Sequence, residues 1–311
     1  MKLTSLKEHV SQKLKRAGLL TSILVTAGFI QQSKAQVNSL SGIYFNNRYQ
    51  VNPAMAGIDQ GLTLNLGLRQ QWNSIAGSPR TQTLTGEYGF NEKTGVGINA
   101  YNDKTGMFTK TKVMATYGYH LPVNADGTKL SFGLSLGFMD QHLDASGLNG
   151  TTGDAAVAQY NDQKPYFDTE FGMAYLSKNL TLQAALTNMK TLFNKDENTT
   201  GGDESSFYAS ASYKFQLSNF LDGSGLEPLV AMRGIRGGDN IIDAGANLTV
   251  AGNAANVMAI YHSTKSATFG LGVNYKSLLT ISGMYTTETS ALRSFASGNF
   301  ELNLKVNLFG K

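Results

Sequence analysis

The chain has 311 residues, 41% of them hydrophobic, no cysteine and a formal net charge of +4. The absence of cysteine excludes disulfides, a thiolate metal site and a cysteine nucleophile. Residues 1–35 hold six of the 26 basic residues and one of the 22 acidic residues, so the rest of the chain has 20 basic and 21 acidic residues, a net charge of −1. That balance excludes the basic surface that nucleic-acid binding requires.

The first 35 residues have the three parts of a secretory signal peptide. Basic residues precede an apolar run from Ala17 to Ile30, and Ser33-Lys34-Ala35 is a small-x-small cleavage site. Because the apolar run is shorter than the roughly 20 residues that a transmembrane helix needs, cleavage is favoured over a membrane anchor. We therefore predict a signal peptide at 1–35, export, and a mature protein that begins near residue 36.

The mature sequence repeats segments of about ten residues in which apolar side chains alternate with small or polar ones. The segment 129–140 shows this best, with Leu or Phe at even positions from Leu130 to Phe138 and Ser or Gly at odd positions from Ser131 to Gly137. No apolar run of about 18 residues follows the signal, so only a closed barrel would satisfy every backbone hydrogen bond in lipid. Export and this pattern together predict a Gram-negative outer-membrane protein rather than a soluble β-sandwich.

Taken in chain order, these segments predict an all-β fold, a transmembrane antiparallel up-and-down β-barrel of about 14 strands over residues 61–311. An even strand number is expected for a bacterial barrel of one chain. The predicted strands lie near residues 62–69, 84–90, 96–100, 113–123, 129–140, 167–175, 180–186, 205–215, 226–235, 241–250, 255–262, 267–275, 278–285 and 299–309.

The connections between these strands alternate in length, as in barrels with short periplasmic turns and long external loops. If the N-terminus is periplasmic, the long connections 140–164, 189–204 and 286–297 face outside. Two connections break the rule, because 216–224 is long for a turn and 263–266 is short for a loop, and one miscounted strand would explain either. The short connections expected in the periplasm are 91–94, 124–128, 177–179, 251–254 and 276–277.

Few residue groupings suggest catalysis or a cofactor. The glycines of GVGIN at Gly95 and GLGVN at Gly270 lie within strands, whereas a dinucleotide-binding loop opens a helix, so they are interpreted as small lumen-facing residues. His262 and Ser263 are neighbours and would point to opposite faces of a strand, and the histidines lack metal-ligand spacing. The sequence therefore predicts no enzyme, no cofactor and no metal.

Charged residues on the polar phase of the strands form another candidate grouping. They could line an open pore or pair across a filled lumen, and the presence of both signs leaves the two alternatives open. Two acidic loops could bind calcium, but neither has EF-hand spacing, so solvated loops are the favoured interpretation. The inward charges are Arg69, Glu87, Lys110, Lys112, Asp168, Glu170, Asp243, Glu301 and Lys305, and the acidic loops carry Asp140, Asp144, Asp154, Asp162, Asp196, Glu197, Asp203 and Glu204.

Two motifs interrupt the barrel pattern at the start of the mature chain. The first is YFNNRYQVNPAMAG at 44–57, and the second is RQQW at 69–72 followed by GSPRT at 77–81. Together they resemble the PorP/SprF family, which has an NPAxAG core and an RQQW…GxPxT pattern, with weaker similarity in LEP at 226–228 and NFEL at 299–302. Met55 and Phe300 depart from the family pattern, which often has an aromatic residue and a histidine at these places.

The resemblance implies an outer-membrane protein of the type IX secretion and gliding machinery of Bacteroidetes. The implied partners are secreted surface proteins with a C-terminal sorting domain, periplasmic or peptidoglycan-linked secretion components, and outer-membrane lipid. The predicted function is to anchor secreted proteins at the cell surface or to help export them. The alternative is a porin or transporter for small solutes.

The motif residues are the candidates for partner binding. Pro53 fixes φ, Ala56 and Gly57 allow close backbone approach, and Asn52 can close a turn, which suits a periplasmic leader at 36–60 folded into or against the barrel mouth. A rigid entry turn before the first strand explains the same residues. Trp and Arg often anchor interfaces, although Trp is also common at membrane interfaces. The candidate partner-binding residues are Asn52, Pro53, Ala56, Gly57, Arg69, Gln70, Gln71 and Trp72.

Overall fold

The computed structural model divides the chain into two units, residues 1–35 and 36–311. All described residues belong to the second unit, so the predicted signal peptide and the acidic residues at 154, 196, 197, 203 and 204 lie outside them. No helix within the described ranges is long and apolar enough to cross a membrane. The described residues are 42–72, 77–144, 155–162, 164–190, 206–217, 223–235, 240–288 and 298–309.

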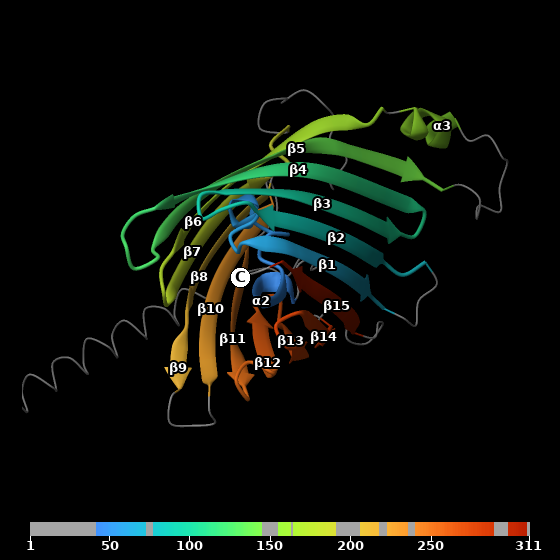
Figure 1. Cartoon of the computed structure of the whole chain (residues 1–311). Helices are drawn as coiled ribbons and strands as arrows, with labels where there is room; N and C mark the ends of the chain where they lie inside the picture. Colours follow the sequence, from blue (N-terminus) through green and yellow to red (C-terminus); the bar gives the residue numbers. More distant parts are fainter. Residues whose placement is uncertain are drawn as a thin grey trace, which may run out of the picture. The chain divides into compact units, whose positions relative to one another are not determined.

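The strands form one antiparallel sheet that closes on itself (Figure 1). Neighbours in sequence pair with one another, and β1 pairs with β15, so the barrel has the up-and-down topology that the sequence predicts. The strands are β1 (Gly61–Gln70), β2 (Arg80–Gly89), β3 (Thr94–Thr105), β4 (Phe108–Pro122), β5 (Lys129–Leu143), β6 (Tyr166–Leu176), β7 (Leu180–Thr187), β8 (Ser206–Tyr213), β9 (Phe215–Leu217), β10 (Ser224–Ile235), β11 (Ile241–Val250), β12 (Ala255–His262), β13 (Ser266–Tyr275), β14 (Leu279–Thr286) and β15 (Asn299–Leu308).

Strands β8 and β9 are two pieces of one barrel strand. Ser212 of β8 pairs with Leu229, and Phe215 of β9 pairs with Leu226, in a single register along β10. Between these pairs lies Pro228, which has no N–H to donate to the ladder. The barrel therefore has 14 strands, which confirms the predicted number.

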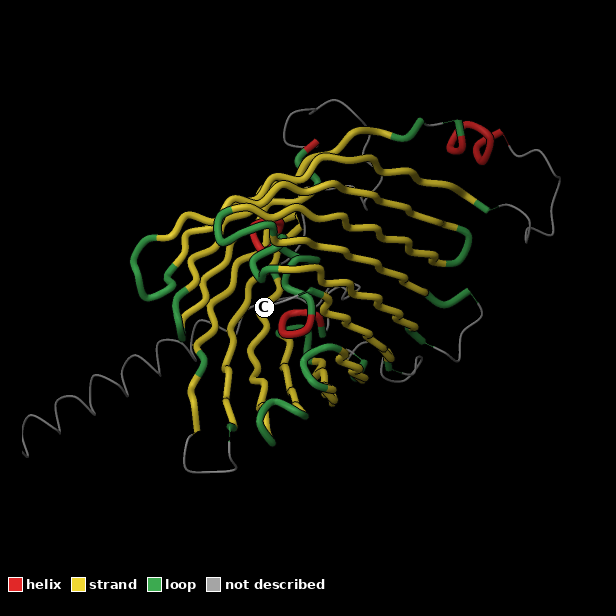
Figure 2. Tube along the Cα trace, in the orientation of Figure 1, coloured by secondary structure: helices red, strands yellow, loops and turns green. Residues whose placement is uncertain are grey.

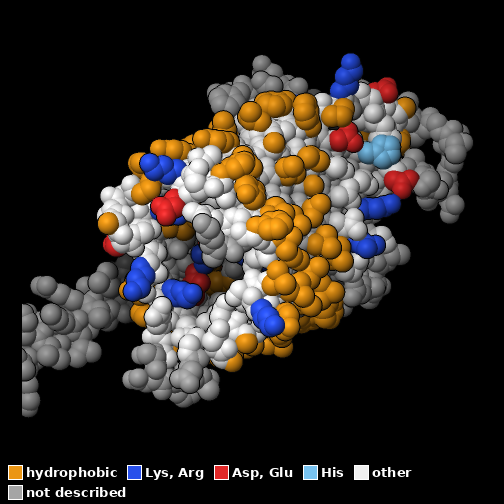
Figure 3. Space-filling model, viewed as in Figure 1, with side chains coloured by type: hydrophobic (Ala, Val, Ile, Leu, Met, Phe, Trp, Pro, Cys, Tyr) orange, Lys and Arg blue, Asp and Glu red, His pale blue; other side chains and the backbone are white. Residues whose placement is uncertain are grey.

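Alternation along the strands separates a lipid-facing wall from an inner wall. In β5, Leu134 is 47% exposed and Phe138 is 60% exposed, whereas Ser135 between them is 1% exposed. The same alternation continues around the barrel, and Figure 3 shows hydrophobic side chains gathered over its strands. This apolar outer wall and small or polar inner wall are what the dyad pattern of a transmembrane barrel requires.

The two ends of the barrel differ in their connections. We call the end where β1 begins the turn end, because the described connections there, such as 177–179 and 276–278, are short. We call the other end the loop end, where β5–β6 and β7–β8 have long connections. Since the barrel has its 14 strands, the short turn 263–265 at the loop end is a real feature rather than the result of a miscounted strand.

Strands β3 to β5 are longer than the sequence pattern indicates. β3 and β4 continue to a two-residue turn at Gly106 and Met107, and β4 and β5 have 15 residues each. About 9–11 residues suffice to cross the membrane, so these strands continue past β6 at the loop end. There, α3 (Ala155–Asn161) packs beside β5, and the Asn161 side chain accepts a hydrogen bond from the Leu143 N–H (2.8 Å) and donates one to its C=O (3.0 Å).

Candidate functional site

The described part of the leader, residues 42–60, lies inside the barrel, where Figures 1 and 2 show its short helices enclosed by strands. It contains α2 (Ile43–Asn46) and the 3₁₀ turn η1 (Pro53–Met55). Tyr44, Ala54 and Ala56 are each 0% exposed. These residues of the leader are therefore folded into the barrel. The assignment of the leader to the periplasm stays a prediction.

The NPAMAG motif builds a tight turn inside the lumen. Asn52 precedes η1, and its side-chain oxygen accepts a hydrogen bond from the Ala54 N–H at 3.0 Å, as helix-capping residues do. Pro53 occupies the first position of η1, where its missing N–H costs no hydrogen bond. Gly57 has φ +65°, a left-handed conformation that glycine adopts without strain.

Glycines on the inner wall of β2 to β6 let the leader backbone approach closely. A Cβ added at Gly133 would lie 2.1 Å from the Pro53 carbonyl carbon, and one at Gly172 would lie 2.0 Å from the Asn52 Oδ1. At Gly95, an added Cβ would lie 2.3 Å from the Ala56 oxygen. We call this inner wall the glycine track, and define it by Gly89, Gly95, Gly118, Gly133 and Gly172.

Polar groups of the leader are bonded to the same part of the barrel. The Asn52 amide donates to the Gln183 Oε1 at 3.3 Å and to the Met173 carbonyl oxygen at 3.2 Å. The Gly57 N–H donates to the Glu87 carboxylate at 2.9 Å. Since a buried polar group without a partner costs about 1–3 kcal/mol, these bonds fix the position of the leader along the track.

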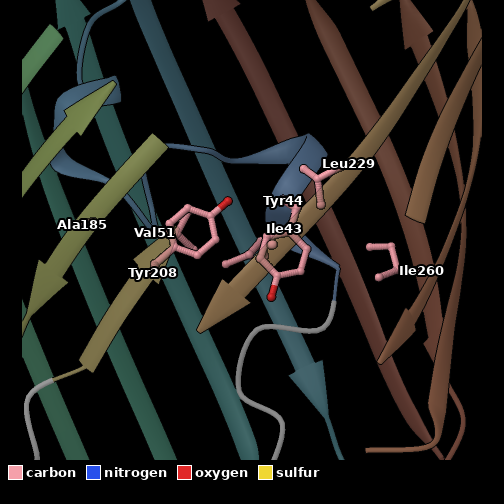
Figure 4. Close-up of a cluster of buried hydrophobic side chains, with 8 residues drawn as sticks. Ile43, Tyr44, Val51, Ala185, Tyr208, Leu229 and Ile260 are labelled. Atoms are coloured by element: carbon pink, nitrogen blue, oxygen red, sulfur yellow. The ribbon is translucent and has the colours of Figure 1, made fainter. Parts of the chain in front are cut away.

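On the opposite side of the lumen, the start of the leader packs into a hydrophobic cluster (Figure 4). Ile43, Tyr44 and Val51 of the leader contact side chains from several strands. The Tyr44 and Tyr208 rings stack with centroids 5.9 Å apart. The barrel contributes Ala185, Tyr208, Leu229, Ala231 and Ile260 to this cluster.

A buried polar network centred on Asp243 joins this cluster. The Tyr44 hydroxyl donates a hydrogen bond to the Asp243 carboxylate, and the Arg233 Nε donates to it at 2.9 Å. The His262 Nδ1 lies 2.6 Å from the Asp243 Oδ1. Burial raises the pKa of the Tyr44 phenol well above its ordinary value, with Arg233 opposing the effect and Asp243 adding to it, so Tyr44 is a neutral donor.

The network continues from His262 to two threonines in an order that resembles a hydrolase triad. The His262 Nε2 lies 2.8 Å from the Thr268 Oγ1, which lies 2.7 Å from the Thr286 Oγ1. A catalytic nucleophile must reach a substrate carbon, but Thr268 is 0% exposed and its hydroxyl is bonded on both sides. The geometry therefore suits a structural network. Sequence reasoning missed it, although Asp243 and His262 lie on the inner phase of adjacent predicted strands.

The RQQW motif lies at the loop end, away from NPAMAG. Arg69 forms a buried ion pair with Glu301, with its Nε 3.4 Å from the Oε1. The Gln71 N–H donates to the Pro79 carbonyl oxygen at 2.9 Å, and the Gln70 amide donates to the Ser78 hydroxyl at 2.8 Å. These bonds connect RQQW to GSP across the β1–β2 loop.

Trp72 follows directly and is half-buried, with φ +48°. Its indole is a hydrogen-bond partner of Glu288, whose pKa is raised by burial and lowered by Trp72 and Arg69, with a net upward shift. The eight candidate residues thus form two separate groups. Asn52, Pro53, Ala56 and Gly57 are buried at the glycine track, whereas Arg69 to Trp72 lie at the loop end.

Several inward charges predicted from the sequence form ion pairs. Lys112 pairs with Glu170. The structure adds a pair that the sequence analysis did not name, between Arg48 of the leader and Glu227. Together with the pairs of Arg69 and Asp243, they favour charges that pair across a filled lumen over charges that line an open pore. Among the described residues, no group of three or more His, Cys, Asp or Glu side chains could hold a metal ion.

A closed antiparallel barrel with an apolar outer wall and a polar inner wall that holds the leader defines the class: an outer-membrane β-barrel protein. The chain belongs to the family described as type IX secretion system membrane protein PorP/SprF, whose model matches residues 33–306. No curated protein matches the sequence.

Solved structures share the barrel at low sequence identity. The Acinetobacter baumannii outer membrane protein Omp33 has a TM-score of 0.50 and 8% identity, covering 81% of this chain and 100% of its own. A triple mutant of the Rhodopseudomonas blastica porin has a TM-score of 0.36 and 10% identity, covering 80% and 99%. Of these two similarities, the one to Omp33 supports the fold, and neither bears on function.

Proposed function

We propose that this protein is a non-enzymatic outer-membrane platform that anchors secreted proteins at the cell surface or helps to export them. The observation that carries the proposal is the leader, which occupies the lumen through backbone contacts with the glycine track and through the Asp243 network. A barrel filled in this way suits binding better than free diffusion. Family membership supplies the secretion context.

The loop end is proposed to face the cell surface and the turn end the periplasm. The unequal connection lengths at the two ends support this orientation. Asp140→Cys at the loop end should react with an impermeant thiol reagent on intact cells, whereas Asp126→Cys at the turn end should not. Both native side chains are exposed and the chain has no other cysteine. Labelling of Asp126→Cys alone would contradict the orientation.

For partner binding, Trp72 is the best placed of the candidate residues. It is half-buried at the loop end, whereas Asn52, Pro53, Ala56 and Gly57 would act indirectly by holding the leader in place. Arg69 and Gln71 are buried too, at 7% and 3% exposure, and would position the loop that carries Trp72.

The test compares Trp72→Ala with Phe90→Ala, a matched loss of an aromatic side chain that is 59% exposed at the turn end. We expect both variants to give a folded barrel, recognised by the different migration of unheated and heated samples on a gel. Trp72→Ala should lose the co-purifying secreted protein, and Phe90→Ala should retain it. Full retention of that partner by Trp72→Ala would remove Trp72 from the binding site.

A porin or transporter for small solutes is the second candidate function. The polar inner wall of β11 to β15, half-exposed near the turn end, favours it. Purified protein in planar bilayers distinguishes the two functions. We expect no steady large current, whereas a steady open-channel current would favour the porin.

A further inference from the structure

The inner wall changes from buried to half-exposed along β10 to β15. On β14, Thr286 is 1% exposed and Ser282 is 3% exposed, but Thr280, nearer the turn end, is half-exposed. On β15, Glu301 is 6% exposed and Lys305 is half-exposed. If the lumen were filled along its whole length, the inner-wall side chains would be equally buried at both ends. The turn-end half of the inner wall of β10 to β15 is therefore accessible.

The leader forms the floor of this accessible space. Along residues 45–50 of the leader, Phe45, Asn46, Arg48 and Gln50 are half-exposed, whereas the residues between them are buried. Arg48 and Glu227 keep 24% and 16% of their side chains exposed in their ion pair. Figure 3 shows the molecule hollowed on this face, with charged side chains of both signs around the hollow.

The space is blind, because its loop-end side is closed by tightly packed groups. Met258, Ile260 and Met284 are buried there, together with Thr268 of the Asp243 network. We call the space the turn-end vestibule and define its wall by Glu227, Asn247, Asn256, Asn274, Thr280 and Lys305.

The wall of the vestibule is rich in side-chain amides. The Asn256 amide donates to the Asn247 Oδ1 at 2.8 Å, and the buried Oδ1 of Asn274 has no hydrogen-bond partner. An amide side chain offers a donor and an acceptor on one group, as a peptide bond does. Small-molecule pockets are lined mainly by apolar and aromatic side chains, so this polar wall suits a hydrogen-bonding chain instead.

Two lysines lie at the mouth of the vestibule. Lys305 lies on the inner phase of β15, and the Lys214 Cε lies 3.7 Å from where a Cβ would stand on Gly225, so its stem lies over the inner wall. The carboxylates nearby already have partners. Glu227 on this wall is bonded to Arg48 and Ser212, and Glu87, whose charge interacts with that of Lys305, accepts a hydrogen bond from the Gly57 N–H. The two lysines therefore favour an anionic ligand.

We propose that the turn-end vestibule binds an extended polypeptide segment that carries acidic side chains or a terminal carboxylate and enters from the turn end. The amide wall pairs with its main chain, and Lys214 and Lys305 pair with its carboxylates. This inference goes beyond the proposed function, because it places a second binding site at the end opposite Trp72.

A photo-crosslinking amino acid placed at position 256 of the full chain in intact cells tests the ligand class. Position 257, on the opposite face of the same strand, is the matched control, since Val257 is 48% exposed on the lipid-facing wall. We expect position 256 to give a discrete, protease-sensitive adduct at least about tenfold above position 257. Lys305→Glu should lower that yield about tenfold, whereas Lys276→Glu on the outer turn should leave it unchanged.

Equal yields at positions 256 and 257 would overturn the proposal. So would an adduct that survives protease but disappears on glycan digestion, because the ligand would then be a glycan. If the Trp72 test succeeds while these crosslinks are absent, the platform function stands and the vestibule fails.

Thiol accessibility tests the vestibule itself without a ligand. In purified protein, Thr280→Cys should react with a methanethiosulfonate reagent at least about tenfold faster than Ser266→Cys, a conservative change at a 3% exposed inner site of the loop end. Equal rates would contradict a vestibule with a closed end.

Discussion

The leader is held differently on the two sides of the lumen. On the side of β2 to β6, glycines bring its backbone into direct contact with the wall, and an added Cβ at Gly133 would lie 2.1 Å from Pro53. On the side of β8 to β14, side chains hold it, through Tyr44 and the buried Asp243 network. Close backbone contact distinguishes the first side, which also has the hydrogen bonds of Asn52 and Gly57, and side-chain packing with a buried polar network distinguishes the second. Substitutions on the two sides should therefore act through different physical causes.

The largest effect is expected on the hydrogen-bonded side, from Asp243→Ala. This change removes the acceptor shared by Tyr44, Arg233 and His262. Breaking a buried ion pair by removing one partner costs about 3–5 kcal/mol, so the urea midpoint of the barrel in micelles should fall strongly. Asp243→Asn keeps the size of the side chain, so its urea midpoint should fall less than that of Asp243→Ala. An unchanged midpoint for Asp243→Ala would show that the network does not stabilise the barrel.

The next effect is expected on the glycine side, from Gly133→Ala. The added methyl group meets leader backbone, which cannot rotate away as a side chain can, so overpacking should cost about 1–3 kcal/mol. The fraction of heat-modifiable barrel in the outer membrane measures it. Gly283→Ala is the control, since its added Cβ would have an ordinary contact of 3.7 Å with Leu302. Equal folded fractions would mean that the leader is not seated on the track.

The smallest effect is expected from Tyr44→Phe, which removes one hydroxyl and keeps the stacked ring. Asp243 still accepts from Arg233 and His262, so the loss should be about 1 kcal/mol. Urea titration of this variant, alone and combined with Asp243→Asn, measures the coupling between leader and barrel. Fully additive losses would contradict a shared network.

Most strands could be predicted from the sequence because a wall between lipid and lumen imposes a period of two. The pattern failed where both faces meet water. Apart from Met107 and Phe108, residues 102–112 are polar on both phases. The pattern therefore predicts a connection at the ends of β3 and β4, although these strands pair as far as Thr105 and Phe108.

The candidate site was less predictable, because its contacts join distant parts of the chain. The sequence indicates that Asn52 and Gly57 need a tight turn, but it cannot show that Gly133 and Gly172 face that turn. The pairing of Asp243 with His262 depends on the register of two adjacent strands, which periodicity alone leaves open.

The most direct test of the account is whether the leader is fixed inside the barrel. The Asn47 amide donates to the Thr85 hydroxyl at 2.9 Å, and the chain has no cysteine, so Asn47→Cys with Thr85→Cys gives a clean disulfide test. A protease site is introduced between residues 58 and 61, and the cleaved protein is analysed on a denaturing gel. The oxidised double variant should keep its leader attached there and release it on reduction. Release without reduction would contradict a leader held inside the barrel.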